Sequence, residues 1–293
     1  MILFMSSHMQ WYIRKNKMRS FVLKQNKFNY INHTFAICAY KESPYLEDCI
    51  KSVKAQTKKS YIIMVTSTPN DHISSLAEKY KIPLFVRDGA SDIAQDWNFA
   101  YDKAKTELVT ITHQDDIYLP EFCEKTVNRL NQAAKPLIAF TGYGERRHKA
   151  NTYKDVYSNK LLNIKKFLLF PMLIKAFENS IFIRRRVLSF GSSICCPSVT
   201  YVKTNLPKHV FVSGYICDLD WQAWEMLSKR KGAFCYISKP LMLHRIHEQS
   251  TTSFMINGTG RKAEDFEMFC KFWPKPIAKF IEMFYKDSEK QNG

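Results

Sequence analysis

The sequence predicts an α/β fold in which a mostly parallel sheet is flanked by helices. Short apolar runs rich in β-branched residues alternate with segments of helical periodicity from residue 34 to residue 112, and this alternation is typical of strands joined in parallel by helices. Polar side chains also follow several of the predicted strands. Ligands bind beyond the carboxyl ends of the strands in open α/β sheets, so these side chains mark the edge where a site is expected.

The first strand is predicted at Thr34–Ala39, and Ser43-Pro44 after it suits the first positions of a helix. In that helix, apolar side chains recur at helical spacing at Leu46, Cys49, Ile50 and Val53. The alternation continues as strand, turn, helix, strand, helix and strand at Tyr61–Val65, Thr66–Asn70, Ile73–Tyr80, Leu84–Val86, Ile93–Ala104 and Leu108–Thr112.

The second half of the chain is less regular. Its predicted elements are a helix near Pro120, a loop at Gly191–Val199, a strand at Val199–Val202, a helix opening at Asp218 and a strand at Leu241–His247. The basic and apolar stretch 163–190 has two interpretations: a core helix with solvated basic ends, or an amphipathic surface that meets a membrane. In the second interpretation the run Arg184-Arg185-Arg186 lies at that surface.

At 293 residues, with 45% hydrophobic and 14% aromatic content, the chain has the composition of a globular protein. Its net charge of +17 predicts attraction to nucleic acid, anionic lipid headgroups or a phosphate-bearing substrate. The eight cysteines are scattered without C-x-x-C pairs, which favours buried thiols in a reducing compartment. The apolar opening is too short for a signal-peptide core, and no apolar run approaches the ~18 residues of a spanning helix. A cytosolic or membrane-surface protein is therefore expected.

The tetrapeptide His113-Gln114-Asp115-Asp116 directly follows an apolar strand. Two adjacent carboxylates repel each other unless a cation lies beside them, and a divalent metal that holds a diphosphate is a common partner. The alternative is a solvated turn before the next helix. Two more strand ends, Ala39-Tyr40-Lys41 and Thr66-Ser67-Thr68, would converge with the tetrapeptide on one crevice. The sequence lacks G-x-G-x-x-G and P-loop fingerprints, which argues against a dinucleotide or P-loop site.

Two acidic residues, Asp218 and Asp220, open a predicted helix in the second half of the chain. The helix dipole stabilises negative charge at this end. Either carboxylate could serve only as an N-cap, so their position alone does not establish a catalytic role.

The strand Leu241–His247 carries basic side chains on both faces. Because side chains alternate along a strand, Arg245 and His247 share one face and His244 lies on the other. A cationic side chain beside an imidazole suits a phosphate group and its metal.

Taken in order, these residues resemble a known family. They resemble the family-two glycosyltransferases, which have the GT-A fold. The shared features are the strand ending in Ala39-Tyr40-Lys41, the helix with Asn98, the carboxylates after Leu108–Thr112, Asp220-Trp221 before a helix, and Arg245-Ile246-His247-Glu248-Gln249-Ser250. The resemblance covers roughly Phe35 to Thr252. It implies a Rossmann-like, mostly parallel sheet flanked by helices, with an irregular helical portion on the acceptor side.

The resemblance also implies a nucleotide-sugar donor, with UDP the favoured nucleotide, bound over the first half of the chain. His113 stands where the family's D-x-D motif often has an aspartate that contacts the nucleoside, and Thr66-Ser67 stands where a base-recognising aspartate is frequent. Trp97 replaces an arginine that often precedes the asparagine at Asn98. The residues expected to contact the donor are Ala39, Tyr40, Thr66, Ser67, Asn98, His113, Asp116 and Arg245.

By the same resemblance, Asp115 matches the metal-binding aspartate that ends the D-x-D motif, and His247 matches a histidine that completes the metal site in many members. An imidazole ligand suits Mn²⁺ somewhat better than Mg²⁺, which prefers oxygen ligands. Asp220 matches the general base of inverting members, although Leu219 replaces the glutamate that usually precedes it. Asp218 is a second carboxylate nearby. The implied reaction is a single displacement with inversion, in which Asp220 accepts the proton of an acceptor hydroxyl.

We expect four parts: a basic N-terminal extension (1–33), a nucleotide-sugar-binding half (34–145), an acceptor-side and catalytic half of the same domain (146–255) and a helical tail (256–293). The expected acceptor is a glycan or a lipid-linked intermediate in surface polysaccharide or glycoconjugate assembly. The expected location is the cytoplasm or the cytoplasmic membrane face, with peripheral contact to anionic lipid.

No specific nucleic acid is expected as a partner. Two other functions stay open at this point. A nucleic-acid-binding protein would account for the positive charge, although not for the carboxylates. A GT-A scaffold without catalytic activity is the other, because the chain departs from the family pattern at His113, Thr66 and Leu219.

Overall fold

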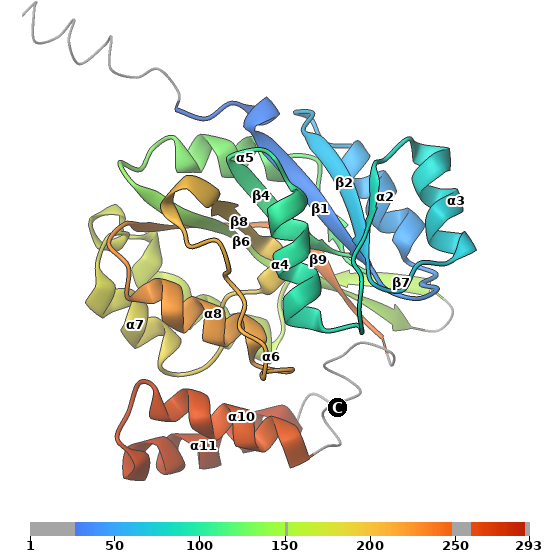
Figure 1. The fold of residues 1–293 in the computed structure, drawn as a ribbon. Helices are drawn as coiled ribbons and strands as arrows, with labels where there is room; N and C mark the ends of the chain where they lie inside the picture. Colours follow the sequence, from blue (N-terminus) through green and yellow to red (C-terminus); the bar gives the residue numbers. More distant parts are fainter. Residues whose placement is uncertain (1–26, 150–151, 248–258, 291–293) are drawn as a thin grey trace, which may run out of the picture.

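The computed structural model describes residues 27–149, 152–247 and 259–290. Its sheet has nine strands in the order β3-β2-β1-β4-β8-β6-β9-β5, and β7 pairs with β6 outside this path. Figure 1 shows the sheet running through the molecule with helices packed against it. Most of the expected N-terminal extension, residues 1–26, lies outside the described residues.

Every strand and helix predicted for the first half is present, with ends that differ by no more than a residue or two. β1 pairs in parallel with both β2 and β4, and β2 pairs in parallel with β3. The elements are β1 (His33–Ala39), α2 (Leu46–Lys54), β2 (Tyr61–Thr66), α3 (Asp71–Tyr80), β3 (Leu84–Val86), α4 (Ile93–Lys103) and β4 (Leu108–His113).

The second half extends the sheet beyond β4 with strands of both orientations. β8 is antiparallel to its neighbours β4 and β6, whereas β6 and β9 run parallel to each other. Parallel pairing joins more residues than antiparallel pairing, so the predicted α/β fold with a mixed, mostly parallel sheet is confirmed. The elements are β5 (Ile117–Tyr118), α5 (Phe122–Leu130), β6 (Pro136–Lys149), β7 (Thr152–Val156), β8 (Val199–Val202) and β9 (Ala233–Ile246).

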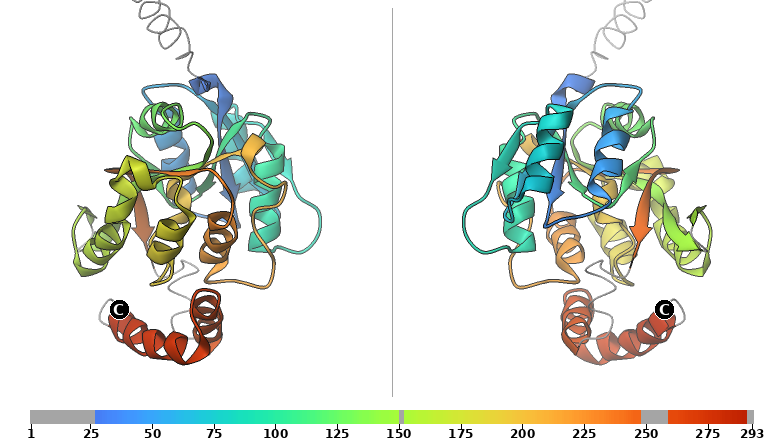
Figure 2. Two further views of the ribbon diagram at one scale, coloured as in Figure 1. Left: turned by 90° about the vertical axis from the view of Figure 1, so that its left-hand side faces the viewer. Right: turned by 90° about the vertical axis from the view of Figure 1, so that its right-hand side faces the viewer.

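Helical elements fill the rest of the second half. Figure 2 shows α10 and α11 side by side below the α/β layers. The α-helices are α6 (Lys160–Leu169), α7 (Ile181–Leu188), α8 (Leu219–Ser228), α10 (Thr259–Cys270) and α11 (Lys275–Lys290). The 3₁₀ turns are η1 (Tyr30–Asn32), η2 (Phe170–Leu173), η3 (Lys175–Phe177), η4 (Cys196–Ser198) and η5 (Lys203–Asn205).

Several helices begin at side chains that bind the first free backbone N–H groups. An Asn, Asp or Ser at the N-cap accepts such a hydrogen bond and so replaces the missing intrahelical partner. The capping residues are Asn70 for α3, Asp92 for α4, Asn159 for α6 and Ser180 for α7.

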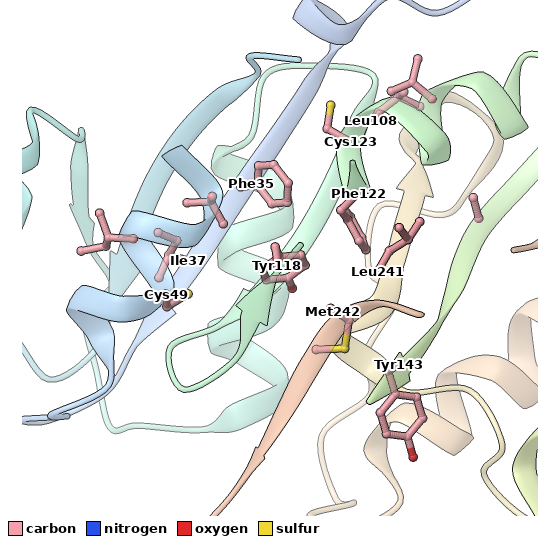
Figure 3. Packing of buried hydrophobic residues seen from close by; sticks show 14 of the residues in the cluster. Phe35, Ile37, Cys49, Leu108, Tyr118, Phe122, Cys123, Tyr143, Leu241 and Met242 are labelled. Carbon is pink, nitrogen blue, oxygen red and sulfur yellow. The ribbon is translucent and has the colours of Figure 1, made fainter. Parts of the chain in front are cut away.

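Two hydrophobic cores lie on opposite faces of the sheet, because successive strand side chains point to opposite sides. On β1, Phe35 and Ile37 belong to one core, whereas Ala36 between them belongs to the other. The first core packs the sheet against α2, α3 and α5, and Figure 3 shows Phe35, Tyr118 and Phe122 meeting there. The second core packs the sheet against α4, α7 and α8. The chain therefore forms three layers with a site edge at the carboxyl ends of β1, β2 and β4.

The helical pair α10 and α11 is joined to these layers by a third, smaller core. Trp221 of α8 contacts Met268 and Phe269 of α10, and Ala278 of α11 completes the cluster. The Trp221 indole N–H donates to the Leu188 carbonyl oxygen at 2.9 Å. The start of α8 is therefore packed between α7 and the carboxyl-terminal helices.

The interpretation of Arg184-Arg185-Arg186 as a surface run is wrong for its first two members. The Arg184 side chain is buried and donates to the carbonyl oxygens of Ser228 at 2.8 Å and Gly232 at 2.5 Å, and to that of Arg230. Arg185 forms an ion pair with Glu225 at 2.7 Å. α7 packs against α8, so Arg184 satisfies carbonyl groups at the end of α8, whereas Arg185 pairs with a carboxylate of α8 and is only partly exposed. Burial lowers the pKa of Arg184 to about 10.

Replacement of Arg184 by Met is expected to lower the free energy of unfolding by about 3 kcal/mol, because buried carbonyl groups at the end of α8 would lose their donor. Urea denaturation of Arg184→Met measures this loss. The control Arg230→Gln changes an exposed side chain in the same turn and is expected to stay within about 0.5 kcal/mol of the wild type. Equal stability of Arg184→Met and wild type would contradict the capping role.

No helix in the part of the chain that the structure describes is long and apolar enough to span a membrane. All eight cysteines carry free thiols, and Cys49, Cys123, Cys196 and Cys235 are buried. The predicted buried thiols are therefore present at these positions.

Candidate functional site

The tetrapeptide His113–Asp116 lies at the carboxyl end of β4, and the Gln114 side chain holds it there. The Tyr40 backbone N–H donates to Gln114 Oε1 at 2.8 Å, and Gln114 Nε2 donates to the Tyr40 carbonyl oxygen at 3.1 Å. This amide extends the parallel pairing of β1 with β4 beyond its last backbone pair, Cys38 with His113. The strand ends at Ala39 and His113 therefore lie next to each other, as the convergence argument predicts.

The carboxylates of the tetrapeptide contact β9. Asp115 Oδ2 lies 2.9 Å from His247 Nε2, and the fully buried Asp116 accepts at Oδ1 from His244 Nδ1 at 2.9 Å and from the Arg245 N–H at 3.1 Å. The structure thus brings together Asp115 and His247, the two residues expected to bind metal. The turn after β4 is not a solvated one, because β9 covers it.

His113, Asp115 and Asp116 form a cluster in which one ligand atom of each residue lies within 4.8 Å of the others. Within the described residues, the buried atoms His113 Nε2 and Asp116 Oδ2 have no hydrogen-bond partner. Buried polar atoms are rarely left unpaired, so a ligand is expected to satisfy them. Two carboxylates and imidazole nitrogens are donors that suit a divalent cation. The residues present therefore fit a metal ion of this kind.

His244 was left out of the expected site residues, but it neutralises Asp116. Burial, the largest influence, lowers its pKa, whereas the charge of Asp116 and the hydrogen bond to it raise the pKa, and the net result is a pKa of about 9. The imidazole is therefore protonated at neutral pH and donates from Nδ1. Its cationic charge makes it possible to bury Asp116 beside Asp115.

The unfolding free energy should carry a pH dependence that belongs to His244. An imidazole in the unfolded chain titrates near pH 6.5, and the folded value is about 9. The stabilisation by the protonated His244 is fully present below pH 6.5 and is lost as the pH rises through about 9. We expect the stability difference between wild type and His244→Gln, measured by urea denaturation, to shrink over this range. A difference that is constant across the range would contradict a raised pKa.

Arg245 lies beneath Asp115 and not at the surface. Its side chain is 1% exposed and lies between the rings of Tyr45 and Tyr153, at 4.5 and 4.9 Å from their centroids. Nε donates to the Asp115 carbonyl oxygen at 2.9 Å, and Nη2 donates to Asp48 at 3.1 Å. These contacts make Arg245 a positioning residue for Asp115. The ring of His247 also packs against Tyr45, so Arg245 and His247 share one face as predicted.

The expected nucleoside side of the site lies at the ends of β1 and β2. Lys41, in the left-handed region at φ 51°, donates its N–H to Thr68 Oγ1 at 2.7 Å and so links the two strand ends. Ser67 donates to Asp96 Oδ2 at 2.8 Å, and Arg87 donates to Asp96 Oδ1 at 2.6 Å. Thr66 is buried and accepts the Thr68 N–H at 3.0 Å. Ala39 is buried beside them, whereas Tyr40 is exposed.

Asp96 and Arg87 were not predicted as site residues. Asp96 lies on α4 and places a carboxylate beside Ser67, where the family often has an aspartate after the second strand. Arg87 follows β3, and the rule that polar residues at strand ends mark a site could have identified it. No local pattern distinguishes Asp96 from other acids on a helix.

Two neighbouring residues of α4 contact different parts of the structure. Trp97 stacks on the His113 ring at a centroid distance of 4.8 Å, and burial lowers the pKa of His113 although Asp116 and Asp115 raise it. Asn98 accepts at Oδ1 from the N–H groups of Val210 and Phe211 and donates to the Phe211 carbonyl oxygen at 2.7 Å. The Asn98 side chain therefore holds the backbone of the segment before α8.

The two candidate catalytic carboxylates lie at the start of α8. Asp220 accepts the Trp221 N–H at Oδ1 (2.6 Å) and the Ser192 hydroxyl at Oδ2 (3.5 Å). Asp218 occupies the N-cap position, but its side chain makes no capping hydrogen bond. Burial raises the pKa of the Cys195 thiol, and the charges of Asp116 and Asp220 both raise it further. Asp116 of the cluster and Asp220 of α8 therefore both lie near Cys195.

The segment before α8 is held by a residue far along the chain. The Glu264 carboxylate, on α10, accepts the backbone N–H groups of Ile216 at 3.0 Å, Cys217 at 2.8 Å and Asp218 at 3.0 Å. Three successive N–H groups that converge on one carboxylate form a strong anion site. Sequence reasoning did not identify Glu264, because no local pattern links it to Asp218.

Comparisons with known proteins identify a family and a fold that this chain resembles. The model of one protein family, described as Glycosyl transferase family 2, matches residues 34–190, which are more than half of the chain. An uncharacterized glycosyltransferase of Rickettsia typhi is 24% identical over 278 residues, which are 92% of this chain and 79% of that protein.

Solved structures of similar fold include two bacterial proteins. The S. aureus TarS fragment 1–349, in complex with UDP-GlcNAc, superposes with a TM-score of 0.57 at 12% identity and covers 85% of this chain and 70% of its own. Glucosyl-3-phosphoglycerate synthase from Mycobacterium tuberculosis, in complex with phosphoglyceric acid, gives a TM-score of 0.52 at 12% identity and covers 82% and 79% of the two chains. These likenesses show a shared GT-A fold.

Proposed function

Because the chain belongs to glycosyl transferase family 2, whose members take a nucleotide-sugar donor and invert the anomeric carbon, we propose that it moves a hexose from a UDP-linked sugar to an acceptor hydroxyl. The observation that carries this proposal is the cluster of His113, Asp115 and Asp116 at the carboxyl end of β4. A diphosphate and its metal need such a cluster at this edge of the sheet.

The donor nucleoside would lie over the ends of β1 and β2. Tyr40 is exposed there, and Ser67 and Asp96 supply polar atoms beside it. The similar TarS structure holds UDP-GlcNAc, which supports a uridine nucleotide. Ala39 and Thr66 are buried, so their contribution to donor binding would be made through the shape and backbone of the strand ends.

The metal ligands we propose are Asp115 and His247, with His113 and Asp116 completing the site. Mn²⁺ fits this donor set better than Mg²⁺, because imidazole nitrogens contribute alongside carboxylate oxygens. A divalent cation bound here would offset the negative charge that develops on the leaving diphosphate. Arg245 would keep the Asp115 backbone in place, and it would not contact phosphate directly.

Asp220 is the general base we propose. Its carboxylate accepts the Trp221 N–H at Oδ1 and the Ser192 hydroxyl at Oδ2, and it would accept the proton of the acceptor hydroxyl. The hydroxyl oxygen would then attack the anomeric carbon on the side opposite the diphosphate, which inverts that carbon. Asp218 would support this role through its negative charge nearby, and Glu264 would hold the segment that carries both residues.

The acceptor we propose is a glycan or a lipid-linked intermediate of surface polysaccharide or glycoconjugate assembly, used at the cytoplasmic face of an anionic membrane. A lipid-linked acceptor needs an enzyme that reaches a bilayer surface. The positive charge of the chain, +17 overall, supports such contact.

A thermal-shift screen of nucleotide sugars in the presence of Mn²⁺ tests the donor assignment, because a ligand that binds only the folded state raises its stability. We expect a UDP-sugar to give the largest shift, and EDTA to remove it. The selected donor is then incubated with the protein, and release of UDP is measured. Binding without release would support the scaffold function, and no shift with any nucleotide sugar would contradict the proposal.

A further inference from the structure

Exposed hydrophobic side chains gather on one continuous stretch of the chain. Among the described residues, five of the six exposed phenylalanines lie between positions 164 and 190. The part of this stretch formed by α6, η2 and η3 is named here the apolar stripe. Its residues are Ile164, Phe167, Phe170, Leu173, Ile174 and Phe177, which are 40%, 79%, 61%, 46%, 42% and 36% exposed.

The segment that carries the apolar stripe packs against the rest of the protein. The opposite side of the same stretch is apolar as well, and there Leu162, Leu169 and Met172 are buried. η2 contacts α6, α7 and β9, so the segment is fixed to the sheet. The core-helix interpretation of this stretch explains the buried side but leaves the exposed side without a partner.

The stretch of sequence that forms the apolar stripe is rich in basic residues. Lys160, Lys165, Lys166 and Lys175 lie within the stretch, whereas residues 156–177 contain no Asp or Glu. Lys166 donates to the Tyr157 carbonyl oxygen at 2.6 Å, and Lys175 is exposed at the far end. A partner of this surface must therefore offer both an apolar region and negative charge.

We propose that the apolar stripe docks on an anionic lipid bilayer, with its aromatic and aliphatic side chains in the boundary between headgroups and acyl chains. Phenyl rings and branched aliphatic groups gain from burial at that depth, while lysine stems reach back to the phosphates. Each lysine near an anionic surface adds to the attraction, which salt weakens. Arg184 and Arg185 take no part, because one caps α8 and the other pairs with Glu225.

Two other occupants fit the surface less well. In a two-fold dimer the same patch of both copies would meet, which would bring the lysines of one copy against those of the other. A nucleic acid would satisfy the lysines, but its phosphate backbone gives no burial to Leu173 or Ile174. An anionic bilayer satisfies both requirements.

The inference deepens the proposed function, and rests on it only in naming a lipid-linked acceptor as the reason for docking. Binding to a bilayer can be measured without transfer, on the full chain. Affinity for UDP with Mn²⁺ is measured in parallel for each variant, so that failure of docking and failure of the donor site are distinguished.

Co-sedimentation with vesicles of phosphatidylcholine alone, or of phosphatidylcholine mixed with phosphatidylglycerol, tests the docking. We expect the wild type to bind the anionic vesicles, and Phe167→Ser combined with Phe170→Ser to lower the partition coefficient about ten-fold or more. The matched control is Ile31→Ser combined with Tyr61→Ser, two side chains of η1 and β2 that are 63% and 60% exposed. The control should bind as the wild type does.

Two more measurements identify the contact. Lys166→Gln combined with Lys175→Gln should weaken binding to anionic vesicles and flatten its salt dependence. Phe167→Trp should be quenched by brominated lipid, whereas Ile31→Trp should show no quenching beyond that of the native tryptophans.

Several outcomes would overturn the inference. These are wild-type binding to neither vesicle type, full binding by the Phe167/Phe170 variant, or equal quenching of the two tryptophan variants. Loss of self-association in the Phe167/Phe170 variant, seen by light scattering without any lipid binding, would assign the surface to a second copy. If these substitutions weaken binding to duplex DNA but do not change binding to lipid, the surface would be assigned to nucleic acid.

Discussion

Asp220→Asn should lower the transfer rate by about 10²–10⁴-fold, the usual contribution of a general base, while the affinity for UDP and Mn²⁺ stays within a few-fold of the wild type. The asparagine keeps the oxygen that accepts the Trp221 N–H, so the start of α8 is expected to hold its shape. The amide cannot take a proton at neutral pH. Transfer is followed with the donor chosen by the thermal-shift screen, and donor affinity by calorimetry.

Asp218→Asn is the matched variant for this experiment, because it removes a carboxylate from the same segment and leaves Asp220 intact. We expect a much smaller loss of rate from it. If Asp220→Asn transfers sugar at nearly the wild-type rate and Asp218→Asn does not, the roles of the two carboxylates are reversed.

Asp115→Ala is expected to abolish metal-dependent binding of UDP, with a loss of affinity for Mn²⁺ of more than about 100-fold. The substitution removes one carboxylate of the cluster and the hydrogen-bond partner of His247. Calorimetry with UDP is performed with and without Mn²⁺, so that the metal-dependent part of the affinity is obtained by difference.

Asp102→Asn, which changes an exposed aspartate of α4, provides the control for lost charge. Its affinity for UDP and Mn²⁺ should equal that of the wild type. Unchanged metal-dependent binding by Asp115→Ala would remove Asp115 from the metal site. Denaturation without metal checks that the variant is folded.

The first half of the fold could be predicted closely because its signals are local. Apolar runs such as Leu84–Val86 and capping residues such as Asn70 mark the ends of strands and helices within a few residues of chain. The parallel arrangement follows from the alternation of those elements. The direction of β8 could not be derived in this way, because it depends on a long and irregular connection.

The candidate site was predictable where a motif combined with a strand end. The pair of Asp115 with His247 joins two such motifs, which lie on different strands and meet at 2.9 Å. The contacts of Arg245 and Asn98 were not predictable, because each depends on which neighbours surround the side chain. Arg245 lies between two tyrosines, and Asn98 binds backbone groups more than a hundred residues later.

The misplaced arginines show why charge alone is a poor guide to a surface. Arg184 and Arg186 are two positions apart on α7, and so they lie on different sides of the helix. Arg184 is buried, whereas Arg186 is exposed and lies over the Trp273 ring at 4.5 Å. Consecutive charged residues on a helix therefore point in different directions, so that some are buried and others are exposed.

The contact between Glu264 and the backbone of residues 216–218 determines when, during synthesis, the protein becomes competent. A chain emerging from the ribosome folds from its amino-terminal end, and β1 to β4, with His113, Asp115 and Asp116 at the end of β4, emerge early. The segment that carries Asp218 and Asp220 receives its carboxylate partner only after residue 264 has been made. His247, the partner of Asp115, also emerges late. The metal site and the base are therefore both completed only when the carboxyl-terminal part of the chain has been made.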